Sequence, residues 1–183
     1  MTSLPRRMLW ASLLHADTYE EVEADRSSIR QAWVVMLAAA TAIGVARYLQ
    51  ASGAGLSGRP LALQVGLAVV EPLIVWIAGS AFAFMVGASF FRGPETETDF
   101  AEVLRTTGFA FTPALLRIFA LVPPAVLGLS IDLLVRLWVL VAIVIALRQA
   151  LDFTTLRAVG TFGTATVLLY LIIWGLSTAP LPL

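Results

Sequence analysis

The sequence contains no cysteine, no lysine and only one histidine. Without cysteine the chain can form no disulfide bond, and it has neither a thiol nucleophile nor an attachment motif for c-type haem. A zinc site of the usual kind needs several cysteine or histidine ligands, so we expect His15 to be a surface residue and not a metal ligand. The composition therefore predicts no metal and no cofactor.

Charged residues are also scarce, since they make up 13% of the chain, about half of the usual share. Twelve basic residues balance twelve acidic ones. The chain therefore has no net field that would attract nucleic acid, and we exclude binding of DNA or RNA. Every basic residue is arginine, while alanine, leucine, valine and glycine dominate, which indicates a GC-rich bacterial genome.

Hydrophobic residues, in contrast, are abundant. They account for 59% of the 183 residues, and the mean hydropathy of +0.88 lies outside the range of soluble proteins. We therefore predict an all-α integral membrane protein.

Five apolar segments approach the roughly 20 residues that a helix needs to cross a hydrocarbon core about 30 Å thick. These segments are residues 32–48, 72–91, 108–128, 131–147 and 158–177. Helix-capping signals precede four of them, at Ser28, Asp99 with Glu102, Ser130, and Thr154 or Thr155. The prediction is a bundle of five transmembrane helices with short amphipathic or interfacial helices beside it.

The N-terminal part of the chain is more polar than the rest. We expect residues 1–30 to be a cytoplasmic amphipathic segment and residues 31–183 to be the transmembrane domain. The side chains predicted to meet the lipid headgroups are those of Leu4, Met8, Trp10 and Leu13 or Leu14. Thr18 and a glutamate three residues later have the spacing of a capping box and predict a surface helix. A secretory signal is rejected because the apolar run is short and no Ala-x-Ala cleavage site follows it.

Glu71 and Pro72 interrupt a long apolar region, and two interpretations of it remain open. In the first, residues 61–70 are interfacial or re-entrant and the second span starts at Pro72, because proline suits the first turn of a helix and a carboxylate is favoured there. In the second, one long helix is kinked at Pro72. Pro113 is expected to kink the third span, and Pro123 with Pro124 is expected either to end it or to kink it again.

The arginines indicate the orientation of the chain, since cytoplasmic loops carry an excess of basic residues. With the N-terminus inside, the outer loops hold only Arg47 and Arg59. The cytoplasmic segments then hold Arg6, Arg7, Arg26, Arg30, Arg92, Arg105, Arg148 and Arg157. We therefore expect a bacterial cytoplasmic (inner) membrane protein with its N-terminus in the cytoplasm and its C-terminus outside.

Three stretches of sequence are characteristic when they are taken together. They are YEEVEAD at residues 19–25, FAEVLRTTGFAFTP at residues 100–113, and WVLVAIVIALRQA at residues 138–150 with TTLRA at residues 154–158. This set resembles the Yip-domain family, the Ypt/Rab-interacting integral membrane proteins, and in particular its short bacterial members.

The resemblance implies five transmembrane helices and a cytoplasmic N-terminus, and it marks Gly108 to Pro113 as a family motif at the mouth of the third span. Eukaryotic members bind prenylated Rab-type GTPases and act in vesicle traffic. We do not carry this activity over, because the DLYGP motif and the long cytosolic N-terminal region of those members are absent here.

Four ionisable residues lie within or at the ends of the spans, namely Glu71, Arg117, Asp132 and Arg136. A charge in hydrocarbon costs about 2.5 to 3.5 kcal/mol on insertion scales, so these residues should face the bundle interior and pair. The topology places all four in the outer leaflet with zero summed charge. They either fix the packing, with Asp132 and Arg136 as an i,i+4 pair, or form a small outward-open cavity that binds an ion or a lipid headgroup.

Gly79, Ala83 and Gly87 recur at four-residue spacing on the second span. Small residues at this spacing let helix backbones approach closely. We expect the stripe to serve packing within the bundle, and a homodimer contact is the alternative.

The sequence has no catalytic constellation, no P-loop and no HExxH zinc motif, and we expect no enzymatic activity. The first hypothesis is that the protein binds membrane lipids or another membrane protein through a cytoplasmic face formed by residues 19–30 and 99–105. The second is a small transporter or lipid-handling protein that uses the charge cluster of the outer leaflet. The third is an accessory subunit of a larger membrane complex.

Overall fold

The computed structural model describes residues 3–53, 61–92, 98–121 and 125–178, and every regular element in these ranges is helical. In chain order the elements are α1 (Leu4–Ser12), α2 (Ala16–Ala24), α3 (Ser28–Gly53), α4 (Leu61–Phe90), α5 (Phe100–Ala110), the 3₁₀ helix η1 (Thr112–Leu121), α6 (Ala125–Ala150) and α7 (Thr155–Thr178). The predicted all-α class is therefore confirmed for the described part of the chain.

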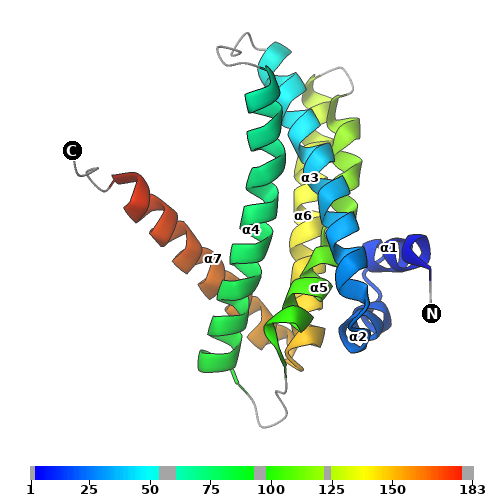
Figure 1. Cartoon of the computed structure of the whole chain (residues 1–183), viewed down its shortest axis with the longest axis vertical. Helices are drawn as coiled ribbons and strands as arrows, with labels where there is room; N and C mark the ends of the chain where they lie inside the picture. The colour runs from blue at the N-terminus through cyan, green and yellow to red at the C-terminus, as the bar shows by residue number, and fades with distance from the viewer. Residues whose placement is uncertain (1–2, 54–60, 93–97, 122–124, 179–183) are drawn as a thin grey trace.

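The helices form an elongated bundle, which Figure 1 shows along its length. Helices α3, α4 and α6 run along the long axis. Helix α5 and η1 follow one another in the same direction and lie beside α3 and α6. Helix α7 packs against α4 and α6 and diverges from the bundle toward its C-terminal end. The short helices α1 and α2 lie against one side, near the end at which α3 begins.

Four helices are long and apolar enough to cross a membrane, namely Ser28–Leu49, Leu63–Phe90, Val126–Ala150 and Thr155–Gly175. Their outward faces carry large apolar side chains that are more than half exposed, among them Ile74, Met85, Phe90, Leu129, Leu134, Tyr170 and Trp174. Water-soluble proteins rarely expose so much apolar surface. These lengths and surfaces are those of a multi-pass membrane protein, while the third segment that we predicted to be a span is not among the four helices.

Helix α4 is continuous over Leu61–Phe90, with Pro72 inside it. The interpretation of residues 61–70 as an interfacial or re-entrant segment is therefore wrong, and the continuous helix of the alternative interpretation is confirmed. Pro72 has no N–H, so the carbonyl of Ala68 lacks its usual helical donor. A Cβ on Gly44 of α3 would stand 3.1 Å from that carbonyl oxygen. The proline thus falls where the backbone of α3 approaches α4 closely.

The third predicted span is not one α-helix kinked at Pro113. Helix α5 ends at Ala110, and the chain continues as the 3₁₀ helix η1. Pro113 cannot donate to the carbonyl of Phe109, and the hydroxyl of Thr112 donates to that carbonyl instead, at 2.7 Å. The expected kink is therefore replaced by a change of helix type. The two prolines at positions 123 and 124 lie outside the described residues.

The helix starts follow the capping signals only in part. The side chain of Asp99 accepts from the N–H of Glu102 at 2.8 Å, and the side chain of Glu102 accepts from the N–H of Asp99 at 2.9 Å, so this capping box is confirmed. Ser130 is not a cap, because α6 begins at Ala125 and the Ser130 hydroxyl donates to a carbonyl one turn earlier in the same helix.

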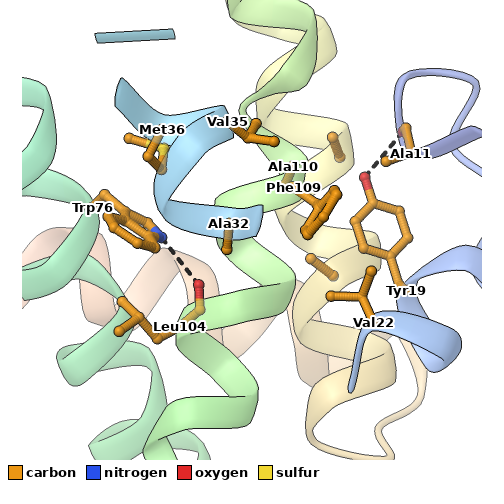
Figure 2. Packing of buried hydrophobic residues seen from close by; sticks show 12 residues of the cluster. Ala11, Tyr19, Val22, Ala32, Val35, Met36, Trp76, Leu104, Phe109 and Ala110 are labelled. Carbon is orange, nitrogen blue, oxygen red and sulfur yellow. Dashed lines mark hydrogen bonds between the residues drawn. The ribbon is translucent and has the colours of Figure 1, made fainter. Parts of the chain in front are cut away.

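A hydrophobic core cluster joins α1 and α2 to α3, α4, α5 and α6 (Figure 2). The Trp76 indole donates to the carbonyl of Leu104 at 3.2 Å, and the Tyr19 hydroxyl donates to a carbonyl of α1 at 3.0 Å. Gly108 lies in the same region, and a Cβ on it would stand 2.9 Å from the Cβ of Ala32 and 3.1 Å from the Trp76 ring. The glycine of the family motif is therefore a point of close contact between three helices.

The α1–α2 hairpin is held together by a buried arginine. Arg7 is 3% exposed, and its guanidinium donates to Glu21 at 2.8 Å, to Asp25 at 2.8 Å and to Gln31 at 2.9 Å. The predicted capping box of Thr18 is wrong, because Thr18 is buried inside α2 and Glu21 binds Arg7. The non-local ion pair replaces the local cap.

The apolar residues of the first segment agree with the prediction only in part. Leu4, Met8 and Leu14 pack against the core cluster and are partly buried. Leu13 is 53% exposed, as predicted, and Leu9, which was not predicted, is 57% exposed.

Candidate functional site

A cavity of about 470 Å³ lies between α4, α6 and α7 and is closed at its back by α3, α5 and η1. This volume falls within the roughly 300–1,000 Å³ that is typical of small-molecule sites. Helix α7 lines the cavity with Phe162, Ala165, Thr166 and Leu169 before it diverges from the bundle. Helix α7 therefore forms one wall of the cavity over its first and middle turns.

Three of the four predicted charged residues form one hydrogen-bonded chain at this cavity. Asp132 accepts from the Nε of Arg117 at 2.8 Å and from the Nε of Arg136 at 2.6 Å, with one arginine on each carboxylate oxygen. Arg117 comes from η1 and is 6% exposed, whereas 55% of the Arg136 side chain is exposed. The Arg117–Asp132 pair thus joins η1 to α6, while Arg136 remains accessible at the cavity.

Glu71 also lines the cavity, but its partner is absent from the predicted cluster. Its carboxylate accepts from Nη1 of Arg47, which comes from α3. From the sequence we assigned Arg47 to an outer loop and therefore did not include it in the charged cluster. One feature of the sequence could have indicated its position. Arg47 lies one helical turn after Ile43, on the same face of α3, and both residues line the cavity. The four predicted residues sum to zero charge, and the addition of Arg47 leaves one positive charge in excess among three arginines and two carboxylates.

The charged residues lie at similar depth in the bundle. Glu71 is ten residues from the start of α4 and Arg136 is eleven residues from the start of α6. At 1.5 Å per residue, these separations correspond to about 15 Å and about 16 Å along the helix axes. Both helices start at the same end of the bundle (Figure 1). The cluster therefore occupies one level, nearer to that end than to the other.

The rest of the cavity is mostly apolar. Its lining beyond the charged level includes Val75, Ala83, Leu140, Ile143, Leu147, Phe162 and Leu169. The few polar side chains there bind one another, since the hydroxyls of Ser80 and Thr107 are 2.8 Å apart and the Trp76 indole donates to Thr107 at 3.2 Å. The cavity consequently has a charged end and an apolar end.

The stripe of small residues on α4 has two environments. A Cβ on Gly79 would meet nothing within 4 Å, so this glycine leaves space in the cavity. Ala83 is 4% exposed, and a Cβ on Gly87 would lie 2.9 Å from the side chain of Leu151. The stripe therefore packs within this chain at Ala83 and Gly87 and enlarges the cavity at Gly79.

The two segments that we expected to form a cytoplasmic partner surface pack against each other. Arg105 is 3% exposed, and its Nε donates to the carbonyls of Val22 at 3.1 Å and Glu23 at 2.8 Å, at the end of α2. Further buried residues of these segments are Tyr19, Ser28, Val103 and Leu104. The surface open to a partner is therefore smaller than predicted.

Glu23 lies at this contact and has a shifted acidity. Burial, together with the nearby carboxylates of Asp152, Glu102 and Glu20, raises the pKa of Glu23 from 4.5 to about 7, and the positive charge of Arg105 opposes this rise. A large share of the molecules therefore carries a proton on Glu23 at neutral pH.

His15 lies at the start of α2, where it is exposed and its ring centroid is 4.5 Å from that of Trp10. Among the residues that the structure describes, no group of three or more histidine, cysteine, aspartate or glutamate side chains could hold a metal ion. The arginine-rich end of the cavity is therefore the charged site that we consider further.

One protein-family model matches the chain. It is described as the Yip1 domain and covers residues 10–176, which include every charged residue of the cavity as well as Gly108 and Pro113. No curated protein and no solved structure matches the chain.

Proposed function

Because the chain belongs to the Yip1-domain family of membrane proteins, we propose that it is a non-enzymatic five-span protein that binds a membrane lipid in its cavity. One observation carries this proposal, namely the cavity of about 470 Å³ with charged residues at one end and apolar side chains along the rest. A lipid has the same order of a polar head and an apolar chain. This is the lipid-handling hypothesis of the sequence, now with a specific place for the ligand.

The length of α5 and η1 supports a fifth crossing. Helix α5 has 11 residues and η1 has 10. At 1.5 Å per α-helical residue and about 2.0 Å per 3₁₀ residue, the two extend over about 36 Å. This exceeds the roughly 30 Å of a hydrocarbon core. As an α-helix throughout, the same residues would extend over about 32 Å, so the change to a 3₁₀ helix adds about 5 Å.

Five crossings place the two ends of the chain on opposite sides of a bacterial inner membrane, with the arginine-rich N-terminus in the cytoplasm. Since the chain has no cysteine, the variants Ser3→Cys and Ser177→Cys each contain a single thiol. We expect a membrane-impermeant maleimide to label only Ser177→Cys in intact cells, and both variants after lysis. Equal labelling of both in intact cells would indicate an even number of crossings.

A substitution that places a larger side chain in the cavity tests whether lipid binds there. Because a Cβ on Gly79 would meet nothing within 4 Å and Gly79 lines the cavity, the side chain of Gly79→Leu occupies part of the cavity volume. Overpacking costs typically 1–3 kcal/mol, so we expect phospholipid retained after purification in detergent to fall by about tenfold. Native mass spectrometry counts the retained lipids per protein.

Gly66→Leu is the matched control, because Gly66 is on the same helix, has no neighbour within 4 Å of its Cβ position and does not line the cavity. It is expected to retain lipid like the unchanged protein. Equal retention by the Gly79→Leu and Gly66→Leu variants would place the bound lipid on the outer surface and contradict the proposal.

A membrane-protein partner is a second candidate, because the outer half of α7 leaves the bundle. Tyr170, Ile173 and Trp174 are 67%, 52% and 58% exposed there. A photo-crosslinker at position 170 is expected to give one discrete protein adduct in native membranes if a partner covers α7. Adducts with lipid alone would exclude this second candidate.

A further inference from the structure

We propose that the cavity selects a lipid with an anionic headgroup and that Arg136 is the residue that binds the anion. This inference rests on the proposed lipid-binding function and adds the class of the ligand. The cavity carries three arginines against two carboxylates. A neutral or zwitterionic occupant leaves the excess positive charge uncompensated, whereas one anionic group neutralises it.

The three arginines differ in how many of their nitrogens bind a carboxylate, in whether that carboxylate is shared, and in how exposed their side chains are. Arg117 directs both Nε and Nη2 at the same Asp132 oxygen and has a side chain that is only 8% exposed. Arg47 has Glu71 as a partner of its own. Arg136 shares Asp132 with Arg117 through its Nε and has a 55% exposed side chain. The excess charge therefore resides on Arg136.

The chemistry of the guanidinium favours a phosphate as the anion. An arginine has five N–H donors in a planar fork, and one of them binds Asp132 in this structure. The terminal nitrogens can then donate to two oxygens of one phosphate group, which is a geometry that arginine recognises well. Inside a membrane such charge-assisted contacts are strengthened, since the effective dielectric constant is low.

In the proposed topology Arg136 lies deep in the membrane, on the outer side of the middle of α6. Arg136 is about 16 Å from the start of α6, the end of that helix assigned to the outer side. The apolar lining continues from this level toward the other end of the bundle, past Leu140 and Ile143 to Leu147. A headgroup at Arg136 would thus place its acyl chain along the apolar lining, which continues past the middle of the 26-residue α6 toward its cytoplasmic end.

The test compares the affinity for phosphatidylglycerol with that for phosphatidylcholine, both titrated into the full-length protein in detergent and counted by native mass spectrometry. We expect the unchanged protein to prefer phosphatidylglycerol by about tenfold or more, as one charge-assisted contact allows. In Arg136→Gln this preference should fall to nearly one. Arg157→Gln removes an exposed arginine outside the cavity and should keep the preference.

No preference in the unchanged protein, or an undiminished preference in Arg136→Gln, would overturn the inference. Binding of inorganic phosphate at Arg136 without lipid binding would also overturn it, since the ligand would then be a free anion.

The failure of this inference is distinguishable from the failure of the proposed function. If both lipids bind equally and Gly79→Leu abolishes both, the cavity binds lipid without selecting its charge, and only the inference is wrong. If Gly79→Leu leaves the binding of both lipids unchanged, the cavity is not the lipid site and both proposals are wrong.

Discussion

The variant Asp132→Leu is expected to lose about 3 kcal/mol or more of stability, because it leaves a buried arginine without its partner. Arg117 is 6% exposed, and two of its nitrogens donate to the same oxygen of Asp132. Removing one member of a buried ion pair costs about 3–5 kcal/mol, since the other charge stays in surroundings that solvate it poorly. The thermal unfolding midpoint in detergent, followed by tryptophan fluorescence, measures the loss.

Two further variants test whether the isolated cation causes this loss. Arg117→Leu should be the milder single substitution, because Asp132 keeps Arg136 at 2.6 Å. The double variant Arg117→Leu/Asp132→Leu removes both buried charges and should recover most of the stability, since no buried cation is left without a partner. If the double variant is as unstable as Asp132→Leu, the explanation is wrong.

The charged site was partly predictable from sequence because charges are rare in apolar segments. Asp132 and Arg136 are one helical turn apart, and Arg117 lies in the preceding apolar segment, so their proximity follows from topology alone. Arg47 could not be assigned in this way, since it lies close to a helix end, where an arginine ordinarily points to water. Its pairing with Glu71 depends on how α3 and α4 face each other, which a single sequence does not encode locally.

The prolines show why the same local signal has different results. Pro72 lies inside a continuous helix, whereas Pro113 marks a change to a 3₁₀ helix. Both remove one helical hydrogen bond. At Pro72 the affected carbonyl, that of Ala68, faces Gly44 of the neighbouring helix, while at Pro113 the adjacent Thr112 hydroxyl binds the affected carbonyl. The environment of the carbonyl, and not the proline itself, differs between the two.

Two helix ends were hidden from sequence analysis because they lack the usual glycine. Leu14 after α1 and Asp152 after α6 have φ values of 62° and 50°, in the left-handed region that glycine normally occupies. In each case the next N–H reaches back to a carbonyl five residues earlier. Leu14 also packs against the core cluster, so burial of its side chain offsets the backbone cost.

The variant Arg105→Met is expected to release the α1–α2 hairpin from the bundle, because one guanidinium holds the end of α2. The Nε of Arg105 donates to the carbonyls of Val22 and Glu23, and Nη2 donates to Glu23 and lies 3.3 Å from Glu102. Methionine keeps the apolar stem but has no donor, and each buried group left unsatisfied costs about 1–3 kcal/mol. The Ser28 hydroxyl still donates to the carbonyl of Val22 at 2.8 Å. The carbonyl of Glu23 therefore loses more hydrogen bonding than that of Val22.

Hydrogen exchange separates this local release from global unfolding. A loss of about 2 kcal/mol should accelerate exchange of the α1 and α2 amides by about 30-fold and leave α4 and α6 unchanged. Arg26→Met removes an exposed arginine near the end of α2 and should have no such effect. Arg105→Lys keeps a charge without the planar fork and should give an intermediate rate. Equal protection of the hairpin in Arg105→Met and Arg26→Met would mean that the Arg7 ion pairs and the core cluster suffice to hold it.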